Sequence, residues 1–512
     1  MPQLIAVGIH PDSSYSAQVL DQLGISARVV ETIAEGIAGG VRVFLWNAPN
    51  ILRQEFRATE RIAIITDHSC INANALAEVE ERARSYYFRL ERGPLRARSF
   101  YANVPAFQVD GSSLGACYDR TNNPIPGSGI KTVQDSNRLI VSLPWNVWAY
   151  KQGAEWEHRP HFSPAARKHF VEVGPLLDTG AFRRLLLEIL LYCFGWLGLP
   201  LVRVSPFYQN KRYFCFRVDA DGFTESSTEA ALRIAEKSGL RFTWFLDIGR
   251  WKKNKKWIMR LIEQDQDVQL HCYRHMTYVR EEVNDINIRK ALDILRRNGI
   301  TPNAIASPFG YNDRGFSEAI KKHGFAYSSE FGYAVDDLPS VPLNDRAFPL
   351  QIPVHPACSG VLREAGFSQQ EQFDHLLHVV ERGCGEDGIC ILYDHPVGGL
   401  ETHETRYVDL FDRLSDNGRR KYICMSDYCR AWIKRPLNLT ILYDHGRIEV
   451  DGFQDNGFQC SARASPRAVS VFRACQDSLC QTFYAISRHQ VDGRGVGHAV
   501  RAVIRHSIYI CG

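Results

Sequence analysis

Several features that would place a protein in a particular class are absent from this 512-residue chain. No basic segment precedes the short apolar run at residues 4–8, so the sequence does not predict a secretory signal. None of the 14 cysteines forms a CxxC pair, and without an export signal reduced thiols are expected. The net charge of +4 is too small an excess to predict a nucleic-acid partner. A cytoplasmic location is the resulting prediction.

Other absences concern the two ends of the chain. The glycines within residues 36–40 lack the spacing of a dinucleotide-binding loop, so the role of the N-terminal region is not readable. No lysine occurs beyond Lys434 and no glutamate beyond Glu449. Apolar periodicity is poor there as well, and no fold can be derived for residues 457–512. A disordered or non-native tail is the hypothesis that this composition motivates.

One apolar stretch, residues 185–202, is a candidate for membrane contact. It is interrupted by Glu188, Gly195, Gly198 and Pro200, whereas a membrane-spanning helix needs about 20 apolar residues. A buried helix that ends near Gly198, followed by a short strand, is therefore favoured over membrane contact.

The first half of the chain is expected to contain two segments. Residues 1–135 alternate short apolar runs with helical pattern, most clearly at 75–90, which predicts a smaller α/β domain with a parallel sheet. Its candidate strands are Leu4–Ile9, Ala27–Glu31, Val41–Trp46 and Arg61–Thr66. Residues 136–210 are expected to form a connecting region that contains the apolar helix and a further helix at 163–170.

Residues 211–435 have the most regular pattern in the chain. Strand-like runs are found at Tyr213–Asp219, Phe242–Asp247, Val268–His271, Ala304–Ser307, Ala326–Ser329, Leu350–Val354, Ile389–Tyr393 and Tyr422–Met425. Helical pattern separates several of them, which predicts a parallel (β/α) barrel with its chemistry at the C-terminal ends of the strands. Residues 436–512 are expected to form a β-hairpin around Asp444-His-Gly, and then the tail.

Four short segments with reactive side chains follow strands of the predicted barrel. They are Arg217-Val-Asp219-Ala-Asp221-Gly, His271-Cys-Tyr-Arg-His275, Ala306-Ser-Pro308-Phe-Gly310 and Leu392-Tyr-Asp-His395-Pro. Asp219 and Asp221 are expected on one face of their strand, where two carboxylates repel unless a positive charge, usually a divalent metal, lies beside them. For this motif taken alone, a turn or helix-cap role is the more common alternative.

The second, third and fourth segments add possible ligands and catalytic groups. His271 and His275 have the spacing that places two imidazoles on one face of a helical turn, where they can hold one metal ion. Two histidines and one carboxylate leave metal positions open for water and substrate. The loop at residues 306–310 can direct a backbone N–H toward a developing oxyanion, although an ordinary turn is favoured for it alone. His395, at the end of a late strand, can act as a general acid.

This ordered set resembles the NodB-homology polysaccharide deacetylases of carbohydrate esterase family 4. The resemblance covers about 225 of the 512 residues and implies a distorted (β/α) barrel. It also implies roles for six residues. They are Asp219 as the base, Asp221, His271 and His275 as metal ligands, Phe309 as the donor of a backbone N–H, and His395 as the acid.

The sequence departs from the family pattern at several positions. Ala220 separates two aspartates that are usually adjacent, so their roles could be exchanged. Cys272 replaces a serine or threonine. Ala306 stands where the family has an arginine that pairs with the base, and Arg217 is a candidate substitute because it lies on the same strand face as that base. Asp336-Asp337-Leu338 matches the fourth family motif poorly and has no assigned role.

The resemblance implies metal-assisted removal of an N-acetyl group from a sugar of a polysaccharide or its precursor, with zinc as the expected ion. A bound metal would acidify a water molecule and polarise the acetyl carbonyl. Two alternatives stay open. They are hydrolysis of another amide or an O-acetyl ester on the same fold, and a catalytically inactive carbohydrate-binding module. The sequence predicts neither the sugar nor the oligomeric state.

Overall fold

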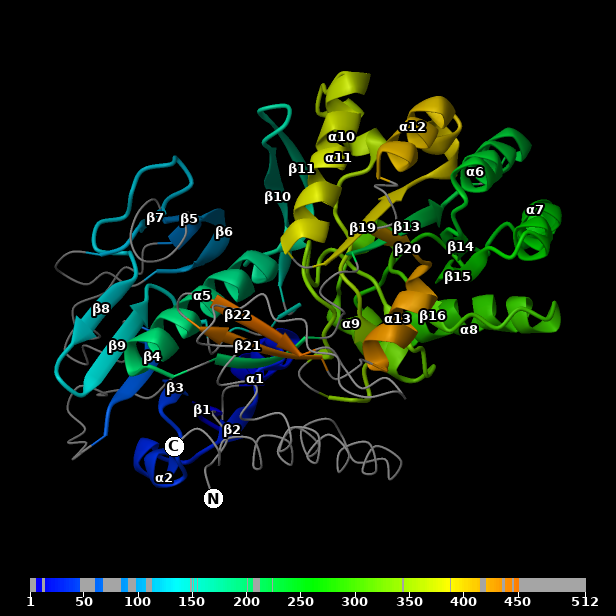
Figure 1. Cartoon of the computed structure of the whole chain (residues 1–512). Coiled ribbons are helices and arrows are strands. Elements are labelled where there is room, and N and C mark those ends of the chain that lie inside the picture. The colour runs from blue at the N-terminus through cyan, green and yellow to red at the C-terminus, as the bar shows by residue number, and fades with distance from the viewer. Residues whose placement is uncertain are drawn as a thin grey trace. The chain divides into compact units, whose positions relative to one another are not determined.

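The computed structural model forms two compact units. It describes residues 6–11, 14–46, 60–67, 84–90, 98–106, 113–147, 150, 152–153, 155–199, 201–205, 212–222, 224–342, 345–386, 388–414, 420–434, 438–443 and 446–450. The first unit comprises 1–150, 181–208 and 436–512, and the second comprises 151–180 and 209–435. Figure 1 labels their elements. The predicted tail at 457–512 lies outside the described residues.

The first unit contains a six-stranded sheet of order β2-β1-β3-β4-β9-β8, in which the first five strands are parallel and β8 is antiparallel to β9. The strands are β1 (Val7–Ile9), β2 (Ala27–Val29), β3 (Val43–Leu45), β4 (Ile62–Asp67), β8 (Lys131–Gln134) and β9 (Arg138–Leu143). Two helices, α1 (Ser14–Leu23) and α2 (Ile33–Ala38), connect the first three strands. The predicted N-terminal α/β domain is confirmed.

Two smaller antiparallel sheets complete the described part of this unit. One joins β6 (Arg98–Pro105), β5 (Arg84–Leu90) and β7 (Ala116–Tyr118), and the other joins β12 (Leu201–Ser205), β21 (Asn438–Tyr443) and β22 (Gly446–Val450). The hairpin predicted around Asp444 is confirmed by the pairing of β21 with β22. The helix predicted at 75–90 is wrong over 84–90, because aromatic residues such as Phe88 pair across strands, here with Phe100.

The apolar stretch at 185–202 is a buried helix followed by a strand, as predicted. Helix α5 (Thr179–Leu197) buries Leu185, Leu186 and Ile189 completely, and β12 follows it. No helix within the described ranges is long and apolar enough to cross a membrane.

The second unit is an open barrel of eight parallel strands. The sheet order is β18-β17-β16-β15-β14-β13-β19, and β20 also pairs with β13. The strands are β13 (Arg212–Ala220), β14 (Thr243–Asp247), β15 (Asp267–Cys272), β16 (Ala304–Ile305), β17 (Tyr327–Ser328), β18 (Leu350–Gln351), β19 (Ile389–Asp394) and β20 (Arg420–Tyr422). The backbone N–H of His355, beyond β18, donates to the carbonyl of Ile391 in β19 at 2.9 Å. The predicted distorted (β/α) barrel is confirmed.

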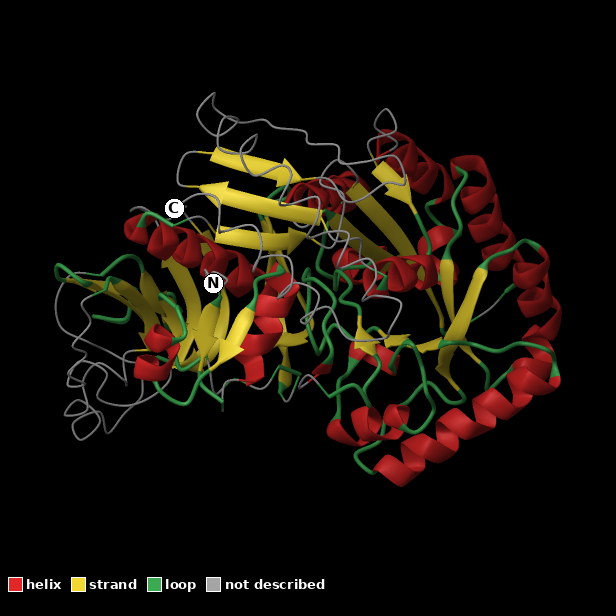
Figure 2. Ribbon diagram, turned by 60° about the horizontal axis from the view of Figure 1, so that its bottom comes forward, coloured by secondary structure: helices red, strands yellow, loops and turns green. Residues whose placement is uncertain are grey.

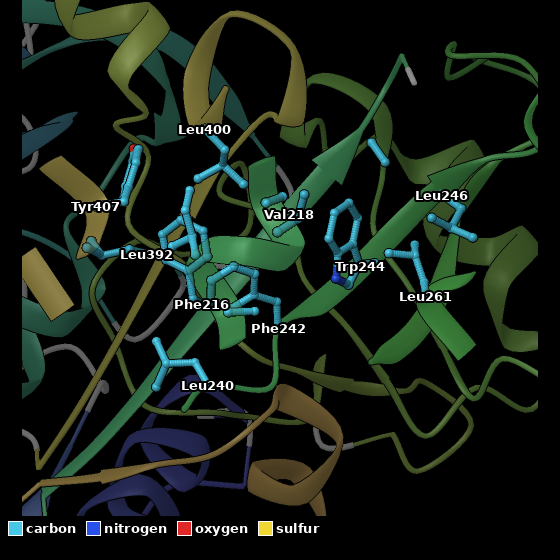
Figure 3. Close-up of a cluster of buried hydrophobic side chains, with 14 of the residues drawn as sticks. Phe216, Val218, Leu240, Phe242, Trp244, Leu246, Leu261, Leu392, Leu400 and Tyr407 are labelled. Atoms are coloured by element: carbon cyan, nitrogen blue, oxygen red, sulfur yellow. The ribbon is translucent and has the colours of Figure 1, made fainter. Parts of the chain in front are cut away.

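Helices surround the barrel strands (Figure 2). They are α6 (Glu225–Ser238), α7 (Trp251–Glu263), α8 (Glu281–Arg297), α9 (Arg314–Lys321), α10 (Ser359–Glu364), α11 (Gln369–Glu386), α12 (Glu404–Leu414) and α13 (Met425–Ile433). Buried side chains from the strands and from these helices form one core, which includes Phe216, Trp244 and Leu392 (Figure 3). The strand predicted at 422–425 ends at Tyr422, and α13 begins at Met425.

Residues 156–175 form a β-hairpin of the second unit, so the helix predicted at 163–170 is wrong. Strands β10 (Trp156–Ser163) and β11 (Lys168–Pro175) pair along their whole length. The physical reason is a two-residue periodicity, since Phe170 is buried whereas the neighbouring His169 and Val171 are not. Lys168, near the hairpin turn, donates to the carbonyl of Gly366 and forms an ion pair with Glu371 of α11.

Candidate metal centre

Three side chains converge beyond the C-terminal ends of β13 and β15. The Oδ1 atom of Asp221 lies 3.2 Å from Nε2 of His271 and 3.1 Å from Nε2 of His275. The two Nε2 atoms are 3.2 Å apart. Three atoms with this spacing surround a point about 2 Å from each, which is the distance at which zinc binds nitrogen and carboxylate oxygen. The three predicted ligands therefore form a set that can hold one metal ion.

A hydrogen bond orients His271 for this role. Its Nδ1 lies 2.8 Å from the carbonyl oxygen of Ala306, and the side chain is buried. A backbone carbonyl at this position requires a proton on Nδ1, so Nε2 presents its lone pair to the metal position. Ala306, which stands in the place of the family arginine, therefore contributes through its backbone.

The electrostatics of the three ligands favour a positive charge at their centre. Burial alone raises the pKa of Asp221, but hydrogen bonds from His271, His275 and His395 outweigh it and lower that pKa well below its usual range. Burial conversely lowers the pKa of His271, and the contact with Asp221 reverses this and raises it. Such a carboxylate stays ionised and attracts either imidazolium protons or a cation.

The predicted base, Asp219, is paired with Arg217 of the same strand. The guanidinium donates from Nε to Oδ1 at 2.5 Å and from Nη2 to Oδ2 at 2.7 Å, and both side chains are buried. Its Nη1 donates to the carbonyl of Ser329 at 2.7 Å. This bidentate geometry fixes both carboxylate oxygens of Asp219. Arg217 therefore pairs with Asp219, the predicted base, as its position on the same strand face suggested. Of the two aspartates, Asp221 is the one that contacts the histidines.

His395 follows a later strand than the other two histidines but contacts the same carboxylate. Its Nε2 is 3.4 Å from Oδ2 of Asp221, and its Nδ1 is 3.8 Å from Oδ1 of Asp394. Burial lowers the pKa of His395, but the two carboxylates outweigh this and raise it well above the usual value. A protonated imidazole at this position can donate a proton to a leaving group.

The sequence reasoning missed Asp394, although it directly precedes His395 in the fourth segment. Asp394 is fully buried and accepts hydrogen bonds from the backbone N–H of Ser359, at 3.1 Å, and from the Tyr407 hydroxyl. Its position as the last residue of β19 was the sequence feature that could have indicated a place in this site. Cys358 also lies close to the carboxylate of Asp394 and the ring of His395.

The third segment lies beside the ligands. Phe309 has a left-handed backbone, with φ of 59°, and its ring centre is 4.6 Å from that of His275. Gly310 follows with φ of 68°, and a Cβ there would lie 2.0 Å from the ring of Phe331. The loop is held in a conformation that this glycine permits.

The remaining unassigned segment, 336–338, lies outside this centre. Asp336 accepts a hydrogen bond from Nδ1 of His355 at 3.0 Å and forms an ion pair with Arg382. Cys272, between His271 and His275 in the sequence, is buried, and burial raises the pKa of its thiol well above the usual value.

Comparison with known proteins identifies the class of this barrel. Residues 211–328 match the family model described as polysaccharide deacetylase. The resemblance is thereby confirmed for residues 211–328, which contain the first three of the four motifs, as that of a divergent member. The fourth motif, at residues 392–396, lies beyond the match. No curated protein matches the chain.

Three solved structures are among those similar to the barrel. A probable polysaccharide deacetylase from Pseudomonas aeruginosa PAO1 has 14% identity and a TM-score of 0.38, with 47% of this chain and 97% of that chain covered. Peptidoglycan deacetylase PdaC from Bacillus subtilis has 13% identity and a TM-score of 0.32, with coverage of 45% and 95%. A CE4 family pseudoenzyme from Bacillus anthracis has 13% identity and a TM-score of 0.32, with coverage of 44% and 70%.

Proposed function

We propose that the barrel is a metal-dependent hydrolase that removes N-acetyl groups from a sugar of a polysaccharide or its precursor. The observation that carries this proposal is the convergence of Asp221, His271 and His275 around one point, with His395 and the Arg217-paired Asp219 beside it. The family match of residues 211–328 supports a deacetylase role.

Each residue of this site has a separate role in the proposed mechanism. A divalent ion, such as zinc, held by Asp221, His271 and His275 would supply Lewis acidity that makes a bound water easier to deprotonate. Asp219 accepts a proton from the water that attacks the acetyl carbonyl carbon, and Arg217 keeps its carboxylate oriented. His395 then donates a proton to the departing nitrogen, because an amide nitrogen leaves poorly without one. The products are acetate and an amino sugar.

Elemental analysis and an acetate assay on N-acetylated chitooligosaccharides test the proposal together. We expect stoichiometric divalent metal in the wild-type protein and its loss in Asp221→Ala and His275→Ala. His395→Ala should keep the metal and release acetate about 10²–10⁴-fold more slowly. His323→Ala is the matched control, because His323 also pairs with an aspartate, Asp285, but lies away from the centre.

The outcomes separate the alternatives. Retained metal in Asp221→Ala and His275→Ala would contradict the ligand assignment. Bound metal without acetate release from these glycans would contradict the deacetylase assignment and favour a binding module. A cytoplasmic location is proposed as well, supported by nine described cysteines whose side chains are buried as thiols. Cell fractionation tests it, and recovery outside the cytoplasm would contradict it.

A further inference from the structure

The rim of the barrel around the metal centre carries an unusual combination of exposed cations and exposed aliphatic side chains. Two segments of the rim contain these side chains. Residues 250–256 include Arg250 and the first half of α7, and residues 274–280 connect His275 to α8. In a parallel barrel the residues that directly follow the strands lie at one edge, so both segments share the edge of the metal ligands.

Contacts within the unit place these segments close together. A Cβ on Gly249 would lie 2.3 Å from the carbonyl oxygen of Tyr273, so the entry to α7 touches the loop that carries His275. Farther along that loop, Val279 lies against the start of α9. A Cβ placed on Gly315 of α9 would be 2.2 Å from the carbonyl oxygen of Val279. The two segments therefore adjoin where Gly249 meets Tyr273, and together they are named here the cationic rim.

The charges of the cationic rim are of one sign. Its two segments contain seven basic residues, namely Arg250, Lys252, Lys253, Lys255, Lys256, Arg274 and Arg280, and no acidic residue. Lys252, Lys253 and Lys255 are exposed. Cations at the N-terminal turn of a helix oppose its dipole, and the N-cap residue Arg250 makes no side-chain cap. This arrangement does not stabilise α7, so it favours a role in attracting an anionic partner.

Aliphatic side chains interrupt the charges. Met276 is 50% exposed and Val279 is 92% exposed, both between Arg274 and Arg280. Val397, which follows β19 on the same edge, is 42% exposed and lies 4.0 Å from the position of a Cβ on Gly222. The hydroxyl and anionic groups of a glycan give aliphatic side chains no hydrogen-bonding partner. A bilayer offers both anionic headgroups and an apolar layer beneath them.

We propose that the cationic rim docks on an anionic membrane surface, with Val279 and Met276 entering the interfacial layer. The metal centre would then face the bilayer. This proposal goes beyond the hydrolase activity and does not depend on it, because docking needs neither the metal nor a reaction.

Cosedimentation of the full-length protein with phosphatidylglycerol vesicles and with phosphatidylcholine vesicles tests this docking. We expect binding to the anionic vesicles that is lost at high salt, and little binding to the neutral ones. Each basic residue near an anionic surface contributes about fivefold to the binding constant, so Lys252→Gln/Lys253→Gln/Lys255→Gln should weaken binding on the order of 100-fold.

Two further variants keep the result interpretable. Arg296→Gln/Arg297→Gln/Arg413→Gln removes the same charge from exposed residues at the ends of α8 and α12, at the opposite edge of the barrel, and should bind like the wild type. Val279→Ser should weaken vesicle binding while leaving binding to heparin, a soluble polyanion, unchanged.

Three outcomes would overturn the proposal. They are equal loss of binding in both triple variants, absence of binding to anionic vesicles, and Val279→Ser binding vesicles as tightly as the wild type. The last outcome, together with tight heparin binding, would indicate a soluble anionic partner instead. None of these measurements involves acetate release, so failure here leaves the proposed reaction intact, and failure of the reaction leaves this result intact.

Discussion

Removal of the Arg217 side chain should destabilise the barrel far more than removal of any exposed arginine. The guanidinium is fully buried and neutralises a carboxylate, Asp219, that is itself 4% exposed. Breaking a buried ion pair by deleting one partner costs about 3–5 kcal/mol, because the remaining charge stays buried without compensation. Arg217→Met should therefore lower the unfolding temperature of the barrel by roughly 6–20 °C.

The assay is thermal unfolding followed by circular dichroism, with a matched control and a rescue. Arg212→Met is the control, since Arg212 begins the same strand but is exposed, and its cost should stay within about 0.5 kcal/mol. Adding Asp219→Asn to Arg217→Met removes the uncompensated charge and should recover most of the lost stability. The double variant should nevertheless release no acetate, because the proposed base is gone.

Two results would refute this reasoning. If Arg217→Met were as stable as Arg212→Met, the pair would not be held in a low-dielectric core. If Asp219→Asn failed to rescue Arg217→Met, the loss would come from the contacts of Arg217 to Ser329 or to the Phe245 ring, whose centre is 4.9 Å away, and not from the buried carboxylate.

Two further predictions concern the same unit. Burial lowers the pKa of His375 to about 3, so the folded barrel keeps this side chain neutral while the unfolded chain takes up a proton near pH 6.5. The contribution of His375 to the free energy of unfolding should therefore be full above about pH 6.5 and fall as the pH drops toward 3. Urea titrations should show a loss of about 2–3 kcal/mol at pH 4.5. An equally steep fall in His375→Gln would contradict this. Gly310→Ala should destabilise the barrel by about 1–3 kcal/mol and slow acetate release, because its Cβ would overlap Phe331. Gly324→Ala, at a similar φ of 66° with open space around it, should show only the smaller backbone cost, and equal losses would exclude the clash with Phe331 as the cause.

The sequence predicted the barrel elements well because their signals are local. Helix α6 has clear local signals at both ends, since Thr224 caps its start and Gly239 ends it with φ of 62°. Strand β19 is a buried apolar run, as expected for a parallel strand covered on both faces. The convergence of Asp221, His271 and His275 was also predictable, because residues at the ends of parallel strands meet at one edge.

The sequence-based predictions fail where contacts between residues far apart in the chain determine the structure. The two-residue periodicity around Phe170 is too short to exclude a helix at 163–170, where the pairing of β10 with β11 instead forms a turn between two strand ends. The role of Asp394 depends on Ser359 and Tyr407, which lie 35 and 13 residues away. Arg217 could be suggested from strand alternation, whereas its bidentate contact with Asp219 required the geometry of two side chains.

The β10–β11 hairpin has a practical consequence for anyone who cuts this chain. A fragment that starts at residue 211, where the family match begins, lacks the hairpin entirely. Phe170 then no longer covers the ring of His375, whose centre lies 5.4 Å from its own, or that of Phe367 at 6.5 Å. The fragment would expose an apolar surface beside α11 that the hairpin normally covers. Fragments for expression should therefore retain residues 151–180.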